Sequence, residues 1–491
     1  MPESAQNHTT PQPMLIGGHW VQSDPPRTIA VENPANKGLA GRVYAASAAD
    51  VDRAALSARD AFPAWRAMPA FERGGALLRI AGDIEQRMED IARTISTETG
   101  NALRTQARPE AQEAARIFRY FGGLATELKG ETLPLGDRLL SYNVREPLGV
   151  VGAIIPWNTP VELAALKIAP ALCAGNTIVL KAAEDAPLAV LKLAEICARH
   201  LPSGTLNVLT GSGEVVGAAI AAHPLIRMVS FTGSTEVGRL IMRAAADRIA
   251  PVALELGGKN PSIVFPDADE DWVARGVVTS MRFTRQSQSC TAGSRVFVHE
   301  SIFDSFMAKV AAEASKLRIG DPLEEETDIG TLINATQFAK VCDYIREGLA
   351  DPNAKLLAGG LPSSSDKIAD GYFASPTIFS YPSNEWRLAR EEIFGPVLVA
   401  IPWRDEAEVI AMANDTHYGL AAFVWTKELK TAVHVAHSLE AGWVQVNQGG
   451  GQILGQSYGG IKQSGMGREC SLEGMLDSFT VRKNVTLNLA Y

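Results

Sequence analysis

The spacing of apolar positions changes along the chain and separates regions of different predicted structure. Residues 50–128 carry apolar positions at helical spacing among many Ala and Arg residues, which predicts a series of helices. From Val150 onward, short apolar runs rich in β-forming residues alternate with helical stretches. The predicted strands are 150–156, 177–183, 206–211, 228–233 and 252–258, and the helices between them reach Cys173, span Leu188–His200, end at Ala222 and span Glu236–Arg248. This alternation predicts a doubly wound parallel α/β sheet, which binds ligands at the carboxyl ends of its strands.

A second alternating series begins after Pro261. Its predicted elements are a strand at 262–266 (SIVFP), a helix at 271–282, a strand at 294–300 (SRVFVHE) and a long helix from Ile302. The stretch 362–367 (PSSSDK) is predicted to be a surface loop, and residues 1–13 a short disordered arm. The last residues, 481–491, predict a strand of the kind that often pairs with another subunit. We therefore predict two interlocked α/β domains.

Composition narrows the function classes. The chain has 491 residues, of which 46% are hydrophobic and 21% charged, as is typical of a folded globular protein. Its formal net charge of −9 argues against nucleic acid or an anionic membrane as the main partner. The most apolar stretch, 147–180, is interrupted by proline and charged residues, which indicates buried core and not a membrane span. The N-terminus lacks the pattern of a secretory signal.

Cysteine usage points to a reducing compartment. The five cysteines are an odd number, contain no CxxC pair and have no ligand-like spacing to histidine. This pattern argues against a disulfide framework and against a metal site, so we expect a cytoplasmic location and no metal.

Two glycine patterns resemble nucleotide-binding loops. GSGEVVG (211–217) has the spacing GxGxxxG, which is a weak signal because the dinucleotide fingerprint is GxGxxG. FTGSTEVG (231–238) follows a predicted strand and opens a helix, so its backbone amides would favour a phosphate. An ordinary turn capped by Ser234 explains the second pattern equally well.

Polar residues follow several predicted strands. Lys181 and Glu184 come after one strand, where they form either a ribose site or a solvated ion pair. Cys290 lies in the polar stretch RQSQSCTAGSR, which suits an exposed thiolate with a lowered pKa better than a structural cysteine. Glu255 ends a strand before two glycines, and Asn158 follows another strand. A thiol nucleophile, a carboxylate base and an amide donor together suffice for covalent catalysis followed by hydrolysis.

The chain resembles the NAD(P)-dependent aldehyde dehydrogenase superfamily from about Pro34 to the C-terminus. Seven blocks occur in the order of that family: PWNTP (156–160), KAAE (181–184), FTGSTEVG (231–238), ELGGK (255–259), SCTAGSR (289–295), EEIFGPV (391–397) and YGGIKQSGMGRE (458–469). The resemblance implies an aldehyde dehydrogenase-like fold with three parts. These would be an NAD-binding domain (1–128 and 148–257), a catalytic domain (258–463) and an oligomerisation arm (129–147 and 475–491), assembled as a homodimer or homotetramer.

The resemblance also implies the catalytic residues. Cys290 would be the nucleophile, Glu255 the general base and Asn158 the side chain of an oxyanion hole whose second donor is the main-chain amide of Cys290. Lys167 and Glu469 match positions of a proton path to the base.

NAD is the cofactor that the resemblance implies. The residues expected to bind it are Ile154, Ile155, Trp157, Lys181, Glu184, Gly213, Gly217, Gly233, Ser234, Gln337, Glu392 and Phe394. Among these, Lys181 and Glu184 would hold the adenosine ribose, and Glu392 the nicotinamide ribose. Because a carboxylate at position 184 would repel a 2′-phosphate, we expect NAD to be preferred over NADP, which some relatives with this glutamate also use.

The sequence departs from the family around the nucleophile and in the substrate tunnel. Ser287 replaces a glycine, at a cost of about 1 kcal/mol if that position has a positive φ. Arg285 replaces the usual asparagine, either as an ion-pair partner or as a group that favours anionic substrates.

The expected tunnel residues are Thr159, Glu162, Leu166, Ser289, Thr291, Gln452 and Tyr458. Thr159, Glu162, Leu166 and Gln452 stand where aromatic or large apolar residues are common, which predicts a roomy, polar tunnel.

The leading hypothesis is hydrolytic, NAD-dependent oxidation of an aldehyde to its carboxylic acid. A CoA-acylating relative is the first alternative, and Glu255 argues against it because that branch needs no base to activate water. A catalytically silent binding protein is the second, and the intact set of Cys290, Glu255 and Asn158 argues against it. Because Glu162 and Arg285 point to opposite substrate charges, the sequence leaves the aldehyde open.

Overall fold

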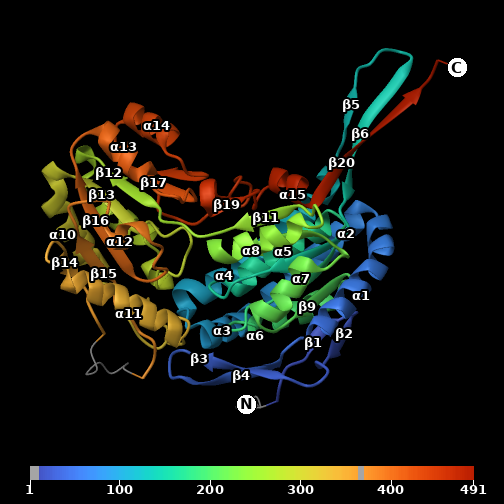
Figure 1. Cartoon of the computed structure of the whole chain (residues 1–491), viewed down its shortest axis with the longest axis horizontal. Helices are drawn as coiled ribbons and strands as arrows, with labels where there is room; N and C mark the ends of the chain where they lie inside the picture. The colour runs from blue at the N-terminus through green and yellow to red at the C-terminus, as the bar shows by residue number, and fades with distance from the viewer. Residues whose placement is uncertain (1–9, 363–369, 491) are drawn as a thin grey trace.

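The computed structural model describes residues 10–362 and 370–490, which form two sheet-centred lobes and a projecting arm (Figure 1). The predicted surface loop lies outside the described residues except for Pro362, and so do the first nine residues of the predicted disordered arm. The rest of that arm is not disordered, because the backbone of Gln12 hydrogen-bonds to Arg42 and Tyr44. None of the helices in the described ranges is long and apolar enough to cross a membrane.

The first sheet contains the predicted parallel strands. Its strand order is β19-β11-β10-β7-β8-β9-β1-β2. The bounds are β1 (Met14–Ile16), β2 (His19–Val21), β7 (Val150–Ile154), β8 (Thr177–Lys181), β9 (Leu206–Leu209), β10 (Ile226–Thr232), β11 (Val252–Glu255) and β19 (Gly465–Met466). Strands β7 to β11 pair in parallel, which confirms the predicted doubly wound sheet. The chain leaves β7 for β8 on one side and later adds β10 on the other, so the topological switch point, where such sheets bind ligands, lies between β7 and β10.

Helices cover both faces of this sheet. They are α1 (Ala48–Ala67), α2 (Ala70–Gln86), α3 (Met88–Thr99), α4 (Arg108–Gly123), α5 (Pro160–Cys173), α6 (Leu188–Ala198), α7 (Ala218–Ala222) and α8 (Thr235–Ala246), with π-helical turns η1 (Leu103–Ala107) and η3 (Gly213–Gly217) and the 3₁₀ turn η2 (Ala125–Glu127). Two buried glutamates cap helix N-termini from other helices. Glu98 accepts hydrogen bonds from the backbone of Leu188 and Ala189, and Glu110 from that of Val161. These caps fix α5 and α6 against α3 and α4, and they hold the start of α5 beside the end of β7.

The second sheet has the order β14-β15-β16-β13-β12-β17-β18 and is parallel except for β14. Its strands are β12 (Pro261–Val264), β13 (Arg295–His299), β14 (Lys355–Ala358), β15 (Thr377–Ser380), β16 (Val397–Trp403), β17 (Ala421–Trp425) and β18 (Trp443–Val446). Its helices are α9 (Asp271–Ser280), α10 (Phe303–Ala314), α11 (Ala335–Ala350), α12 (Arg387–Arg390), α13 (Glu406–Asn414) and α14 (Leu429–Ser438), with 3₁₀ turns η4 (Pro266–Ala268), η5 (Phe283–Arg285), η6 (Glu300–Ile302) and η7 (Lys462–Ser464). The predicted order of elements after Pro261 is confirmed.

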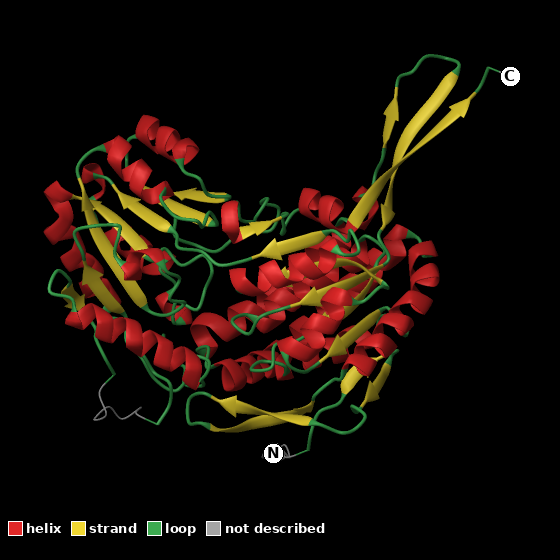
Figure 2. Ribbon diagram, in the orientation of Figure 1, coloured by secondary structure: helices red, strands yellow, loops and turns green. Residues whose placement is uncertain are grey.

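A three-stranded arm projects from the first lobe (Figure 2). It consists of β5 (Glu131–Leu133), β6 (Leu139–Pro147) and β20 (Thr480–Asn488), and helix α15 (Leu472–Phe479) leads into β20. The predicted C-terminal strand is confirmed, and within this chain it pairs antiparallel with β6, from Thr480 opposite Pro147 to Asn488 opposite Leu139. A separate two-stranded sheet, β3 (Thr28–Asn33) with β4 (Gly38–Tyr44), lies near the N-terminus.

Candidate functional site

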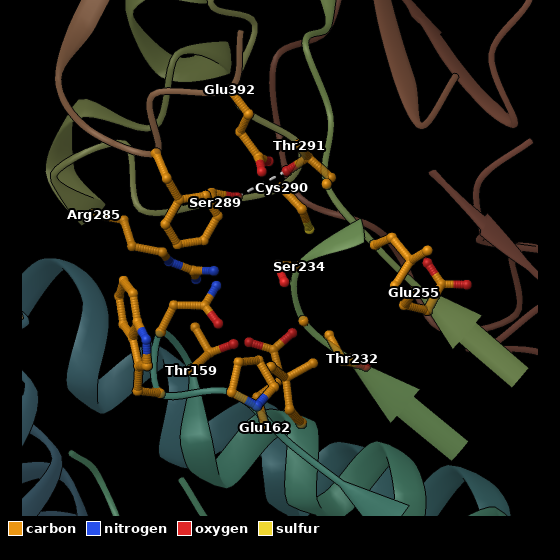
Figure 3. Close-up of a pocket in the computed structure, with 18 of the residues that line it drawn as sticks. Thr159, Glu162, Thr232, Ser234, Glu255, Arg285, Ser289, Cys290, Thr291 and Glu392 are labelled. Atoms are coloured by element: carbon orange, nitrogen blue, oxygen red, sulfur yellow. Dashed lines mark hydrogen bonds between the residues drawn. The ribbon is translucent and has the colours of Figure 1, made fainter. Parts of the chain in front are cut away.

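A cavity of about 250 Å³ lies at the carboxyl ends of β7 and β10, and residues from both lobes line it (Figure 3). Of the predicted site residues, those that line it are Trp157, Asn158, Thr159, Glu162, Leu166, Gly233, Ser234, Glu255, Ser289, Cys290, Thr291, Gln337, Glu392, Phe394, Gln452, Tyr458 and Glu469. Those that do not are Ile154, Ile155, Lys167, Lys181, Glu184, Gly213 and Gly217. The cavity therefore brings all the predicted tunnel residues together with the predicted nucleophile, base and amide donor.

The loop before β13 carries Cys290 in a strained backbone. Arg282, Gln286 and Ser287 all have positive φ, at 59°, 50° and 52°. The Arg282 guanidinium donates to the carbonyls of Gly449 and Gly450 at 3.0 and 2.5 Å, which ties this loop to the glycine-rich loop after β18. These long-range hydrogen bonds hold the conformation that presents Cys290 to the cavity.

The thiol of Cys290 is half-buried, and its surroundings disfavour the thiolate. Burial raises the pKa of Cys290 to about 11, and the charges of Glu392 and Glu255 act in the same direction. A hydrogen bond with the Tyr458 hydroxyl, at 3.7 Å from Sγ, and the charge of Arg285 oppose the rise. The expectation of an exposed thiolate with a lowered pKa is therefore wrong for this pocket, because desolvation outweighs the polar neighbours.

Alkylation by iodoacetamide tests this pKa. Since only the thiolate reacts, the rate at which the protein is alkylated should rise about tenfold per pH unit from about pH 7 to pH 10. Reaction of the other cysteines is subtracted with a Cys290→Ala control. A rate that levels off near neutral pH would contradict the raised pKa.

Ser287 occupies the left-handed backbone region, so the strain expected of a serine there is present. Its hydroxyl is also buried and has no hydrogen-bond partner among the described residues. The positive φ and the unpaired hydroxyl both destabilise the folded state, because the left-handed region favours glycine and a buried hydroxyl without a partner has lost its water.

We expect Ser287→Gly to raise the free energy of unfolding by about 1 kcal/mol, after the greater freedom of glycine in the unfolded chain is subtracted. Chemical unfolding measures the change. Gln286→Gly is the matched control, because it relieves a similar φ but removes an amide that donates to Oδ1 of Asn101 at 3.2 Å and accepts from the backbone of Gly330 at 2.9 Å. If Gln286→Gly raised the free energy of unfolding more than Ser287→Gly, the unpaired Ser287 hydroxyl would not be a source of instability.

Asn158 lies between the two lobes at the end of β7. Its Nδ2 donates to the carbonyl of Gln288 at 3.1 Å, and its own backbone carbonyl accepts from Asn101 at 3.0 Å. A primary amide carries two N–H groups, so the bond to Gln288 leaves a second donor. The side chain is thus fixed beside the nucleophile loop with one N–H free for a ligand oxygen.

Glu255 ends β11 and is 5% exposed. Neither of its carboxylate oxygens has a partner among the described residues. Burial, followed by the charge of Glu469, raises the pKa of Glu255 well above its usual value, and Lys167 opposes this effect. A carboxyl group with a raised pKa and no fixed partner is suited to accept a proton near neutral pH.

A buried ion pair lies next to Glu255. Nζ of Lys167 on α5 pairs with Glu469, and the lysine is completely buried. Glu469 is held by a backbone bridge to Tyr458, with hydrogen bonds of 2.7 and 3.2 Å in the two directions. The two ends of the YGGIKQSGMGRE block thus fold back on each other, and they bring Tyr458 to Cys290 and Glu469 to Glu255.

Ser234 at the cavity, and an ion pair outside it, fit the binding of a dinucleotide. Ser234 is the N-cap of α8, accepts from the backbone of Val237 at 3.2 Å and lines the cavity, so the N-terminus of this helix begins where a phosphate would be favoured. Lys181 pairs with Glu184 at 2.7 Å, and the backbone of Gly213 donates to Glu184 at 3.3 Å. Burial alone would raise the pKa of Glu184, but Lys181 lowers it overall, so this carboxylate is charged.

Glu392 and Phe394, which the sequence predicts to border the nicotinamide, both line the cavity. Glu392 accepts from the backbone of Gly258 at 2.8 Å, and a Cβ at Gly257 would come within 2.5 Å of its carboxylate, so a larger residue at position 257 would displace that carboxylate. The carbonyl of Phe394 accepts from Gln337 at 2.8 Å, and its ring contacts Trp157 edge-on at 5.4 Å. A planar ring would therefore meet the aromatic side chains of Trp157 and Phe394 and the half-buried carboxyl group of Glu392.

Arg285 does not form the expected ion pair, since none of the carboxylates in the described ranges lies within 4.0 Å of its guanidinium. Its Nε instead donates to Oε1 of Gln106 at 2.9 Å. Sequence reasoning missed four residues around the site: Gln106, Glu110, Arg282 and Lys340. No local pattern marks them, because each acts through a contact distant in sequence.

No group of three or more His, Cys, Asp or Glu side chains that could hold a metal occurs in the parts of the chain that the structure covers. The site is built from a thiol, carboxyl groups, an amide and a helix N-terminus.

Comparison with known proteins gives consistent matches. The sequence model of the aldehyde dehydrogenase family matches residues 20–485. HpcC from Thermus thermophilus is 40% identical, with 98% of this chain and 94% of that chain covered and a TM-score of 0.95. PnpE from Pseudomonas sp. WBC-3 is 38% identical, with 98% of each chain covered and a TM-score of 0.94. An aldehyde dehydrogenase from Bacillus cereus, solved as its NAD+ complex, is 37% identical, with 98% and 97% covered and a TM-score of 0.94. A match over nearly the whole length, in sequence and in fold, shows that this chain belongs to the aldehyde dehydrogenase family.

Proposed function

We propose that this protein oxidises an aldehyde to its carboxylic acid with NAD as the electron acceptor, through a covalent intermediate on Cys290. One observation carries the proposal. Cys290, Glu255 and Asn158 line the same cavity; among the described residues the buried carboxyl group of Glu255 has no partner and one N–H of the Asn158 amide is free. These are the nucleophile, the base and the oxyanion donor that acyl chemistry of this kind needs.

NAD is supported by relatives and by this chain's own residues. The Bacillus cereus enzyme and a betaine aldehyde dehydrogenase from Staphylococcus aureus were solved with NAD+.

In this chain Lys181 and Glu184 would hold the adenosine ribose, with Gly213 and Gly217 beside them. Gly233 and Ser234 would contact the pyrophosphate, and the charged Glu184 would disfavour NADP. The nicotinamide would be bordered by Gln337, Glu392, Phe394 and Trp157. Ile154 and Ile155 would line the cofactor cleft. When bound, NAD accepts a hydride.

The first chemical step is addition of Cys290 to the aldehyde carbon. The thiol proton passes to solvent water, a C–S bond forms and the carbonyl oxygen becomes an oxyanion. The free N–H of Asn158 and the main-chain amide of Cys290 would donate to it, and such donors are each worth on the order of 3 kcal/mol. Loss of the hydride from the same carbon leaves an acyl thioester on Cys290.

Hydrolysis of the thioester completes the reaction. Glu255 would take a proton from water, whose oxygen attacks the acyl carbon and releases the acid and the Cys290 thiol. A base with a raised pKa takes this proton well near neutral pH. Glu469 and Lys167 would then carry the proton away from Glu255, since they form the ion pair adjacent to it.

The division of the chain also belongs to this proposal. Residues 1–128 and 148–257 would form the NAD-binding domain, 258–463 the catalytic domain, and 129–147 with 475–491 an oligomerisation arm. The sheet built from β5, β6 and β20 supports the arm. We propose a homodimer or homotetramer in the cytoplasm.

The test is formation of reduced nicotinamide by the purified protein with an aldehyde panel and with NAD or NADP, without CoA. We expect turnover without CoA and a higher kcat/KM for NAD. Turnover that requires CoA would overturn the hydrolytic step, and a preference for NADP would overturn the role of Glu184.

A further inference from the structure

We propose that the substrate is a neutral aldehyde with hydroxyl groups near its reactive carbon, held between the guanidinium of Arg285 and the carboxyl group of Glu162. This inference rests on the proposed function, because it concerns the aldehyde that Cys290 attacks. Both side chains line the cavity of Cys290, and Figure 3 shows that they enter it from different elements, the nucleophile loop and α5.

Arg285 is fixed by a chain of two hydrogen bonds. Its Nε donates to Oε1 of Gln106 at 2.9 Å, and Nε2 of Gln106 donates to Oγ1 of Thr284 at 2.8 Å. Within the described ranges the two terminal guanidinium nitrogens have no hydrogen-bond acceptor. A positioned guanidinium with free N–H groups at a cavity wall is a ready donor to a ligand oxygen.

Glu162 offers the complementary acceptor. It lies in the first turn of α5 and is 9% exposed, and its backbone donates to Glu110 at 3.4 Å. Oε1 accepts from Nε2 of Gln452 at 3.2 Å, and the second oxygen has no protein partner in the part of the chain that the structure covers. The hydrogen bond to Gln452 orients the carboxyl group and leaves one oxygen for a ligand.

Arg285 and Glu162 interact through their charges, without a hydrogen bond or an ion pair between them in the described residues. Burial raises the pKa of Glu162, and the charge of Arg285 is the first effect that opposes this rise. A substrate carboxylate would be attracted by Arg285 and repelled by Glu162, and a substrate ammonium group would meet the reverse. Opposite charges in one cavity therefore favour neither kind of charged aldehyde.

A hydroxyl group satisfies both sides, because it donates to a carboxylate and accepts from a guanidinium. Thr159, Ser289 and Thr291 add three further hydroxyl groups to the same cavity. An apolar chain would leave the buried donors and acceptors without partners, which is unfavourable. Vicinal hydroxyl groups on a short aldehyde match this cavity best.

The test compares kcat/KM for aldehydes with equal numbers of chain carbons: glyceraldehyde with propanal, and succinic semialdehyde with butanal. The native enzyme should prefer glyceraldehyde to propanal by about tenfold or more. Arg285→Gln should lower that preference by about tenfold, and Glu162→Gln should raise kcat/KM for succinic semialdehyde over butanal by a similar factor. Propanal turnover reports any effect on Cys290 itself, so the ratio isolates substrate recognition.

Arg116→Gln is the matched control, because Arg116 is 58% exposed on α4 and lines no part of the cavity. Its substrate ratios should equal those of the native enzyme. Equal kcat/KM for glyceraldehyde and propanal, or ratios that neither variant changes, would overturn this inference while propanal oxidation still supports the proposed function. Failure to oxidise any aldehyde would overturn the proposed function itself.

Discussion

Replacing Cys290 by alanine is expected to abolish aldehyde oxidation, with kcat/KM reduced by about 10⁴-fold or more. Alanine offers no nucleophile, so no covalent adduct forms, and neither Asn158 nor Glu255 can substitute for the missing thiol. The measurement is reduced nicotinamide formed over hours at high enzyme concentration. NAD binding should persist in the variant, because Cys290 is separate from the Lys181–Glu184 pair at the other end of the proposed cofactor site.

Cys342→Ala is the matched control for this substitution. Cys342 is buried on α11, and its side chain does not line the cavity. Its loss should leave kcat/KM within about twofold of the native value, at a modest loss of stability from the smaller side chain. Residual turnover in Cys290→Ala comparable to that of the control would show that another residue carries the covalent intermediate.

Replacing Glu255 by glutamine is expected to slow steady turnover by about 10²- to 10⁴-fold while sparing the first turnover. Glutamine fills the same space but cannot accept a proton from water, so the thioester on Cys290 should accumulate. A rapid burst of reduced nicotinamide, one per active site, would precede the slow phase. With propanal, the mass of the quenched protein should increase by one propionyl group.

Hydroxylamine provides the control for Glu255→Gln, because it cleaves thioesters without a protein base. Hydroxylamine also condenses with free aldehydes, so it is added to the acylated Glu255→Gln protein after the aldehyde has been removed. It should return the protein to its unacylated mass and permit a second burst. Absence of the burst would contradict the assignment, since Glu255 would then act before hydride loss, as the base that deprotonates Cys290.

Much of the first lobe was predictable because its signals are local. The strands from Val150 to Glu255 read as short apolar runs between helical stretches, and each was found within a few residues of its predicted bounds. The prediction that the segment containing Gln12 is disordered was wrong, because the hydrogen bonds of Gln12 are made with β4 and not with its neighbours in sequence. A polar, proline-containing terminus gives no sign that it will pair with the edge of a distant strand.

In the candidate site, too, some features were predictable from the local sequence and others depend on tertiary contacts. The sequence by itself singled out the residues proposed to carry the chemistry, because Glu255 and Asn158 stand in motifs after predicted strands and Cys290 stands in a polar stretch before one. Only the tertiary structure decided their environment. It raises the pKa of Cys290 through burial, hydrogen-bonds Arg285 to Gln106, 179 positions away, and links Glu162 to Gln452, 290 positions away. Charge balance and desolvation depend on which distant side chains share a cavity, and local patterns of hydrophobic and polar residues do not specify that.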